Sequence, residues 1–465
     1  MVFKTFDRKI YFALESTEGT YLAPNASTGY IECTEPSFTV TNRMFERNPT
    51  RGSITQVPQV VAGTSKTAPS ATVEISFSIE MSGEGTTGGG TAPRWGALLK
   101  ACGMKAADGI DSDGSSADAN RVLQRVAVGS TLAGSGAVPL TMFHKENISA
   151  ATGTSYGVGD RSGRVIGDVG YDDAEIFYVK AGATNVPANT EKVVGSISTN
   201  YGTADGVGAA AGCAWFPVSD GALGGEAYTS LSMRFVIGNQ TSTTGTALTA
   251  VGCRGNVEFV FVAGDRVLMN FTFTGRLKGY EEGVTFTPTA EGRPIPPAFV
   301  GADMTIQEST YGASSAAAVS GQIFNSLTIN MGNEMVVREN VEVASGYASC
   351  YITGRMPTMT WNPDAVLAGT YDYWERFLVG DMSRMKLAVG STSGNKFQFK
   401  MPAVQFSGIS EGNRDEVVVY DTTSTLTGGD YGSSVQQASN DTATAVGTAL
   451  NARLGTNNEF CLYQL

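Results

Sequence analysis

The chain has 465 residues, only 16% of them charged, and a formal net charge of −12 at pH 7. This length accommodates about two to four domains, and the acidic balance disfavours a protein that wraps nucleic acid, which needs clustered Lys and Arg. No run of about 18 apolar residues predicts a membrane helix, and no apolar stretch near residue 1 predicts a secretory leader.

The composition favours β-structure. The chain contains 57 Gly and is rich in Thr and Val, which suits strands joined by tight turns. A surface with few charges also suits a protein that covers itself with further copies of itself. The six cysteines are scattered without a C-x-x-C pair and are expected to be buried thiols, with one or two disulfides as the alternative: Cys33, Cys102, Cys213, Cys253, Cys350 and Cys461.

Strands with one apolar face are the clearest elements along the chain. In residues 73–80, apolar Val, Ile and Phe alternate with Glu and Ser, and residues 267–274 and 396–401 also alternate. Residues 175–179 and 192–197 predict two further strands. Three short helices are expected at 93–102, 371–379 and 442–454, the first two each followed by a glycine.

The sequence contains an internal duplication. Residues 37–42 (SFTVTN) resemble 326–330 (SLTIN), and VEF at 257–259 resembles VQF at 404–406. Each half also carries one aromatic-rich helix, around Trp95 and Trp374. We therefore expect a discontinuous first domain (1–107 and 227–296), a second domain (297–465), an inserted β-rich domain at 108–226, and a stiff Pro-rich linker near residue 295.

Little in the sequence points to catalysis. His144 is the only histidine, so a Ser-His-Asp or clustered Cys/His zinc site is not expected. Residues 83–88 fit G-x-G-x-x-G, but βαβ spacing is missing. An acidic run at 111–118 lacks the closing Glu of a calcium loop. We expect no enzyme activity, cofactor or metal.

Several short segments resemble, in their order along the chain, the major tail tube proteins of bacteriophages with long non-contractile tails. They are 46–53 (ERNPTRGS), 91–103 (TAPRWGALLKACG), 252–257 (GCRGNV), 271–275 (FTFTG), 297–299 (PAF), 331–334 (MGNE) and 352–357 (ITGRMP). No single segment is diagnostic. Residues 108–226 depart from the family pattern.

The resemblance implies two tandem tail-tube β-sandwich domains with short flanking helices. Copies would close into rings that stack into a tail, assembled in the host cytoplasm and carried in the virion. Two domains per chain predict a pseudo-hexameric ring of three chains. The implied partners are the chain itself, the tape-measure protein, the tail terminator and distal tail proteins, and phage DNA that passes through without specific binding. No membrane partner is implied.

Two surfaces follow from this interpretation. The polar faces of alternating strands are candidates for the lumen: Glu74, Ser76, Ser78, Glu80, Asn270, Thr272, Thr274, Lys396, Gln398 and Lys400. An ordinary outer solvent face is the alternative. The long connections 48–70 and 339–355 are candidates for contacts between rings, with these residues at or beside them: Arg47, Arg51, Ile54, Val57, Val60, Val61 and Arg338.

The competing hypothesis is a virion-surface β-sandwich that recognises a host glycan or receptor. Scattered aromatic residues of the insertion would serve as platforms, although such residues more often belong to a core: Tyr156, Tyr171, Tyr178, Tyr201 and Trp215.

Overall fold

The computed structural model of the chain is mainly antiparallel β, as the sequence predicts, and its described part contains two helices. The described residues are 8–25, 29–46, 66–83, 93–107, 121–127, 142–146, 163–165, 175–181, 192–195, 200–203, 213–217, 229–238, 245–284, 292–301, 303–308, 317–319, 322–343, 346–392, 394–427 and 459–464.

The first half of the chain contributes seven strands and a helix that we call the first set. In space its strands lie in the order β3-β4-β15-β14-β13-β1, and β2 pairs with β1. The bounds are β1 (Arg8–Leu14), β2 (Tyr30–Ile31), β3 (Thr34–Glu46), β4 (Lys66–Glu80), α1 (Trp95–Ala101), β13 (Leu231–Ile237), β14 (Gly245–Val262) and β15 (Leu268–Val284).

The second half repeats this pairing order, and we call it the second set. Its strands lie in the order β18-β21-β24-β23-β22-β16, with β17 paired to β16, and its helix again follows the second strand of that order. The bounds are β16 (Asp303–Glu308), β17 (Ala317–Val319), β18 (Phe324–Asn330), β21 (Thr358–Pro363), α2 (Tyr373–Val379), β22 (Met382–Val389), β23 (Phe397–Arg414) and β24 (Val417–Leu426).

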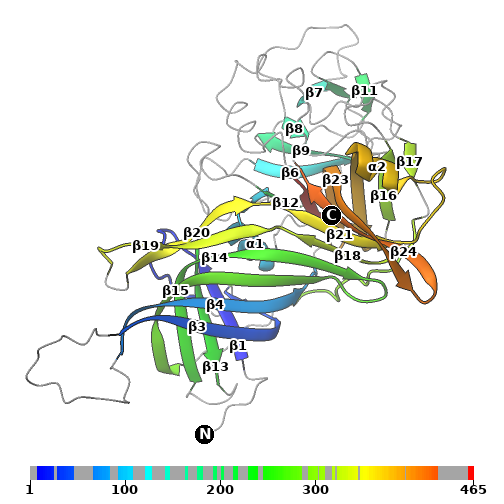
Figure 1. Cartoon of the computed structure of the whole chain (residues 1–465). Coiled ribbons are helices and arrows are strands. Elements are labelled where there is room, and N and C mark those ends of the chain that lie inside the picture. The colour runs from blue at the N-terminus through cyan, green and yellow to red at the C-terminus, as the bar shows by residue number, and fades with distance from the viewer. Residues whose placement is uncertain are drawn as a thin grey trace, which may run out of the picture.

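One antiparallel pairing joins the two sets. The end of β14, Glu258–Val262, pairs with Ser326–Asn330 of β18, and we call this pairing the joint. β13 occupies the same edge of β14 only as far as Cys253, so the last residues of β14 are open to β18. The joint therefore connects the strands in the order β3-β4-β15-β14-β18-β21-β24-β23 within one large sheet, in which β13 and then β1 also extend from β14, and β22 and then β16 extend from β23 (Figure 1).

A shared aromatic core also connects the sets. The ring of Phe399 in β23 lies 5.1 Å from that of Phe259 and 5.2 Å from that of Phe261, both in β14. Trp95 of α1 lies 6.2 Å from Phe397 of β23. These side chains are all fully buried. The apolar positions of the alternating strands thus form one core that neither set completes alone.

Three short strands extend this sheet: β5 (Met104–Ala107), β12 (Cys213–Pro217) and β25 (Cys461–Gln464). β12 pairs with both β5 and β25, and β25 also pairs with β23. Trp215 of β12 is fully buried, 4.7 Å from Trp95. The expected insertion 108–226 is therefore too long, because β12 belongs to the main body.

A separate six-stranded sheet lies within the remaining insertion. Its order is β11-β10-β7-β8-β9-β6, and every pairing is antiparallel. The bounds are β6 (Arg121–Ala127), β7 (Met142–Glu146), β8 (Gly163–Val165), β9 (Glu175–Ala181), β10 (Lys192–Gly195) and β11 (Asn200–Thr203). The two strands predicted here correspond to β9 and β10.

Both helices predicted in the described part are present and end where a glycine was expected. Gly103 and Gly380 follow them with positive φ, 78° and 77°, a conformation that glycine adopts without strain. α2 starts two residues later than predicted because the Asp372 side chain accepts a 2.9 Å hydrogen bond from the Glu375 amide. The helix predicted at 442–454 lies outside the described residues.

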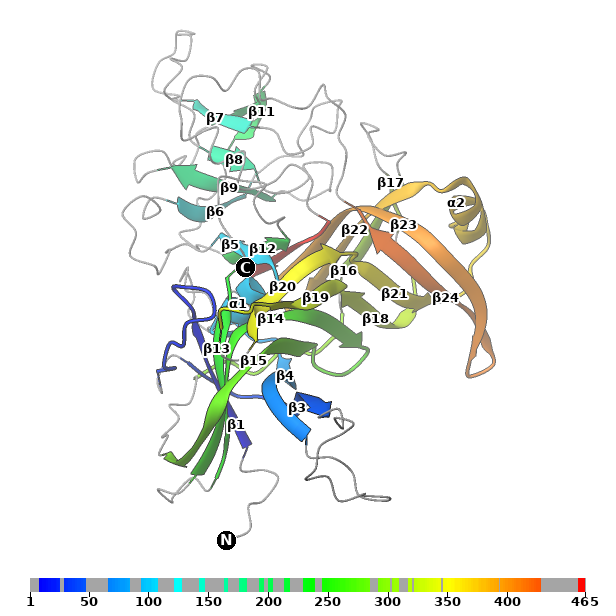
Figure 2. The same cartoon turned by 60° about the vertical axis from the view of Figure 1, so that its left-hand side comes forward.

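A hairpin projects between β18 and β21. It consists of β19 (Asn333–Glu339) and β20 (Tyr347–Arg355), which pair only with each other in the described part of the chain. The chain bends into it at Gly332, where φ is +64° and a Cβ would lie 2.2 Å from the Met356 carbonyl oxygen. Figure 2 shows the hairpin lying across β14 and β15, so the second set reaches back over the first.

We predict that Phe399→Ala lowers the free energy of unfolding by about 3–5 kcal/mol, because it removes the ring that packs on Phe259 and Phe261. Urea denaturation followed by circular dichroism measures the change. Tyr280→Ala is the control, since that side chain is 56% exposed. An equal effect of both variants would contradict the shared core.

Candidate assembly interface

Seven of the predicted lumen residues lie together on one polar face. Cross-strand pairing places Ser78 beside Asn270, Ser76 beside Thr272 and Glu74 beside Thr274. The first of these rows continues across the joint into the second set, through Glu258, Asn330, Thr358, Thr425 and Gln405. The seven predicted residues are Glu74, Ser76, Ser78, Glu80, Asn270, Thr272 and Thr274.

Hydrogen bonds between side chains run along this polar face. The Ser78 hydroxyl donates to Asn270 Oδ1 at 2.7 Å, and Asn270 Nδ2 donates to Glu258 Oε2 at 3.2 Å. At the joint, Asn256 Nδ2 donates to Asn330 Oδ1 at 2.9 Å. The polar face thus crosses from one set to the other without interruption.

The three predicted lumen residues near the start of β23 behave differently. Gln398 is only 3% exposed, so it does not face an open water-filled space, and that expectation is wrong for this residue. β23 is flanked there by β22 and β25, which explains the burial. Lys396 is half-buried and precedes β23, and the Lys400 side chain lies outside what the structure describes.

The second set ends in an open strand edge. β22 pairs with β23 only as far as Gln405, and beyond this point β24 pairs along the opposite edge up to Arg414. We call residues 407–414 the open edge of β23; no described strand pairs with that side. In the first set the corresponding edge of β14 is occupied by β18.

In the first set, the strand with an unpaired edge is β3. β3 pairs with β4 on one side, and no described strand pairs with the other. Phe38 is half-buried and Val40 is 38% exposed, whereas the corresponding residues of β18, Leu327 and Ile329, are 1% and 0% exposed. The difference arises because β18 has β14 beside it and β3 has no such neighbour.

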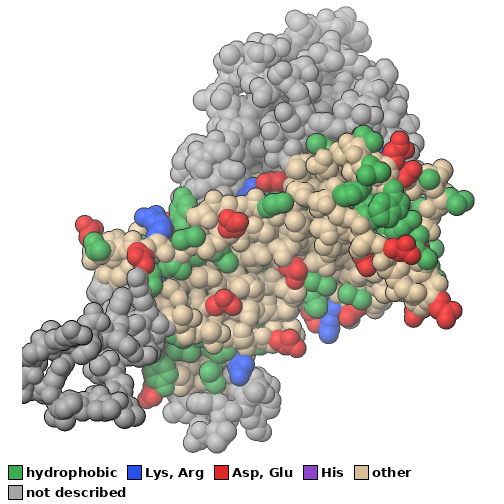
Figure 3. Space-filling view, viewed as in Figure 1, with side chains coloured by type: hydrophobic (Ala, Val, Ile, Leu, Met, Phe, Trp, Pro, Cys, Tyr) green, Lys and Arg blue, Asp and Glu red, His purple; other side chains and the backbone are tan. Residues whose placement is uncertain are grey.

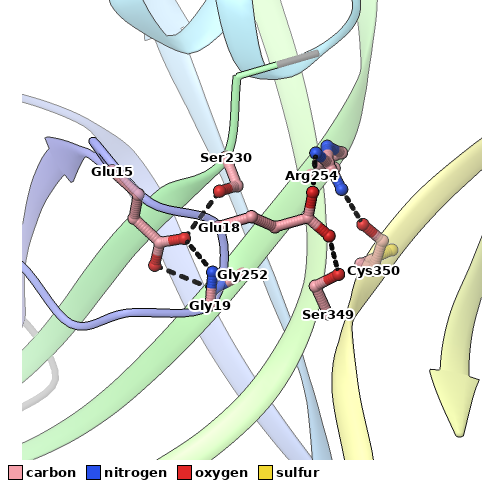
Figure 4. A network of polar contacts seen from close by, with 8 residues as sticks. All are labelled: Glu15, Glu18, Gly19, Ser230, Gly252, Arg254, Ser349 and Cys350. Carbon is pink, nitrogen blue, oxygen red and sulfur yellow. Dashed lines mark hydrogen bonds and ion pairs between the residues drawn. The ribbon is translucent and has the colours of Figure 1, made fainter. Parts of the chain in front are cut away.

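A polar cluster fastens the β19–β20 hairpin to the first set (Figure 4). Arg254 of β14 is 1% exposed; it donates to the Cys350 carbonyl and, at 3.0 Å, to the Glu18 carboxylate. The Ser349 hydroxyl also donates to Glu18. Arg276 adds bonds to the carbonyls of Tyr347 (3.2 Å) and Gly19 (3.1 Å).

Glu15 holds the loop that carries Glu18. Its carboxylate is 8% exposed and accepts hydrogen bonds from the Gly19 amide (2.8 Å), the Ser230 hydroxyl (2.6 Å) and the Gly252 amide (2.9 Å). Ser232 donates a fourth bond at 2.8 Å. Such a buried charge is tolerated only when it is fully hydrogen-bonded, as here. Sequence reasoning missed both glutamates, because all their partners except Gly19 are more than 200 residues away.

The residues predicted to contact a neighbouring ring are mostly outside the described part of the chain: Arg47, Arg51, Ile54, Val57, Val60 and Val61. Arg338 is described; it is exposed on β19 and its guanidinium lies 5.7 Å from the Tyr351 ring. The adjoining connection, residues 339–355, was expected to reach another ring. Within this connection, β20 packs against the chain itself, where Ser349 and Cys350 are buried.

Chemically reactive groups are scarce in the described part of the chain. It contains no cluster of three His, Cys, Asp or Glu suited to a metal ion, and no helix long and apolar enough to cross a membrane. Four cysteines are unbridged thiols. Burial raises the pKa of Cys33 to about 12 and that of Cys350 to about 11, and raises the pKa of Cys102 and Cys253 well above the ordinary value.

The described structure gives no support to a functional role for the G-x-G-x-x-G segment, His144 or the acidic run 111–118. The strand before the G-x-G-x-x-G segment pairs only in antiparallel fashion, unlike a dinucleotide-binding unit. His144 lies on β7 of the inserted sheet, and the acidic run 111–118 lies outside the described residues. Comparison of the chain with known protein families and with curated proteins finds no match.

We predict that Glu18→Gln flattens the pH dependence of stability. Burial acts to raise the pKa of Glu18, but the hydrogen bonds from Arg254 and Ser349 and the charges of Arg254 and Arg338 lower it below 4.5. A carboxylate with a depressed folded-state pKa stabilises above its unfolded pKa, and this stabilisation is lost as pH falls through the folded value.

Urea denaturation at a series of pH values from about 7 to 3 measures this effect. Ser349→Ala, which removes one donor to Glu18, should reduce the slope by a smaller amount. An unchanged slope in Glu18→Gln would show that this carboxylate does not hold the hairpin.

Proposed function

We propose that this chain is a self-assembling structural subunit of a phage tail tube, in which each set acts as one tube domain. The observation that carries the proposal is the joint. Within the chain, the end of β14 pairs with β18 of the second set. Two unpaired strand edges fit a second contact of this kind between copies: the open edge of β23 and the outer edge of β3.

The proposed contact places β3 of one copy on the open edge of β23 of another. Strand addition to an exposed edge satisfies backbone hydrogen bonds that would otherwise be left to water. Transferring the register of the joint, in which Val260 pairs with Thr328, places Ser407 opposite Thr39 of the next copy. The contact is head-to-tail, and such contacts close into rings or continue as filaments.

The number of copies follows from the repeat together with the family resemblance. Each chain contributes two sets with the same strand order, so three chains supply six. A closed ring leaves no strand edge open around its circumference, which removes the aggregation hazard of an open sheet. We therefore propose a trimeric, pseudo-hexameric ring that stacks into a tube.

The polar face is the proposed lumen. It carries the carboxylates of Glu74, Glu80 and Glu258 among uncharged Ser, Thr and Asn side chains. Carboxylates repel DNA phosphates, and short uncharged side chains offer no base-specific contact, so DNA would pass without being held. Tape-measure, terminator and distal tail proteins, implied by the resemblance, are the proposed further partners.

The glycan-binding alternative loses one of its five candidate aromatic residues. Trp215 is fully buried against Trp95, so it offers no exposed platform. The side chains of Tyr178 and Tyr201, and the whole of Tyr156 and Tyr171, lie outside what the structure describes.

Sedimentation at rising protein concentration and negative-stain microscopy test the proposed function. We expect species of three chains and multiples of three, with rings or short tubes in the images. A chain that stays monomeric at high concentration would overturn the proposal, and a ring of six chains would overturn the assignment of two tube domains to each chain.

A pair of cysteines tests the proposed register. In the double variant Thr39→Cys, Ser407→Cys, both exposed positions face each other across the contact, within the Cα separation that a disulfide requires. We expect covalent oligomers on oxidation, visible on non-reducing gels. Thr39→Cys combined with Ser410→Cys, three residues out of register, is the matched control and should form no covalent oligomers under the same conditions.

A further inference from the structure

The two helices occupy the same place in their sets but differ in burial. Five of the seven residues of α1 are buried, whereas only Tyr373 is buried in α2. The outer side of α2 and the loop before it expose large apolar side chains: Trp374 is 42% exposed, Leu378 78%, Val379 67% and Leu367 83%. Figure 3 shows apolar side chains gathered at the end of the body that carries α2.

Part of the cover of α1 comes from the second set. Trp95 packs 6.2 Å from Phe397 of β23, and the Gly83 amide, which follows β4, donates to Asn395 Oδ1 at 2.8 Å. β5 and β12, which follow α1 in the chain, contribute Trp215. α1 is thus buried by strands of its own half together with the start of β23 in the set that follows.

α2 lacks both sources of cover. Only Gly380 and Asp381 separate α2 from β22, so no strands correspond to β5 and β12, and no third set follows β24 among the described residues. Trp374 contacts the Tyr420 ring of its own set at 5.8 Å but keeps much of its surface open to water. Exposed apolar groups of this kind, centred on a tryptophan, are typical of protein interfaces.

We propose that the α2 surface, defined by Leu367, Trp374, Leu378 and Val379, is covered by the β13–β14 sheet of a second copy of this chain. β13 and β14 are the counterparts of β22 and β23, and the first residue of β23, Phe397, packs on Trp95 of α1. This inference rests on the proposed head-to-tail assembly and adds a second, apolar contact to the strand pairing between β23 and β3.

The position of α2 supports this assignment. Tyr373 packs against Phe406, and Gln405 Nε2 donates to the Gly380 carbonyl at 2.9 Å, so α2 lies beside the start of the open edge of β23. A copy whose β3 pairs along that edge brings its own first set next to α2. The same neighbouring copy thus pairs with the open edge of β23 and covers the α2 surface.

Tryptophan fluorescence provides a direct test. The chain has four tryptophans, and three are buried: Trp95 (0% exposed), Trp215 (0%) and Trp361 (3%). Acrylamide quenching of the full-length protein therefore reports mainly on Trp374. We expect quenching to fall and emission to shift to shorter wavelength when monomers assemble, and we expect neither change in the Trp374→Phe variant.

A second measurement uses assembly itself. The double variant Trp374→Ser, Leu378→Ser should raise the concentration at half-assembly at least tenfold, whereas Trp374→Phe should stay close to the parent chain. Ile295→Ser, at a position 88% exposed outside α2, is the matched control for loss of an apolar side chain. Circular dichroism checks that each variant is folded.

The outcomes separate the two proposals. Assembly with Trp374 protected, together with weakened assembly of the double variant, supports both. Rings that form while Trp374 stays fully quenchable would overturn the assignment of the α2 surface and leave the proposed function standing. A parent chain that never self-associates would overturn both, because the second copy is then not the occupant.

Discussion

The antiparallel pairing of β14 with β18 is the contact on which the rest of this structure depends. A strand at the edge of a sheet presents amide and carbonyl groups that need partners, and β14 is longer than the β13 strand beside it. The backbone groups at the exposed end of β14 pair with β18, in the second half of the chain. Because the second set repeats the first, its long strand β23 also ends in backbone groups that need partners. No described strand pairs with that edge of β23.

Alternation of side chains converts this run of strands into a wall with two different faces. Phe259, Phe261 and Phe399 lie on the apolar side and build a core common to both sets. Ser78, Asn270 and Glu258 lie on the other side and form a hydrogen-bonded polar row. The hairpin that Arg254 fastens across the joint adds a third connection. The two sets are thus held as one unit, which suits a rigid building block better than two tethered domains.

The differences between the two sets are as informative as their likeness. The first set carries the inserted sheet together with β5 and β12, and its helix is buried. The second set lacks these strands, and its helix is exposed. The second set therefore offers the open edge of β23 beside the apolar surface of α2. The first set offers the edge of β3, where Phe38 and Val40 are only partly covered. This polarity favours head-to-tail association over a symmetric dimer.

The sequence alone determined the local elements and the two-faced character of the strands. Residues 73–80 alternate with period two and pack as predicted, and the glycines after both described helices mark where those helices end, because these signals act over a few residues. Only the tertiary structure decided which strands are neighbours. In the tertiary structure β12 belongs to the main body, and Gln398 is buried between two flanking strands. Glu15 and Glu18 there bind partners more than 200 residues away in the sequence. The open edge of β23 is likewise invisible in the sequence, because an edge is defined by the strand that is missing beside it.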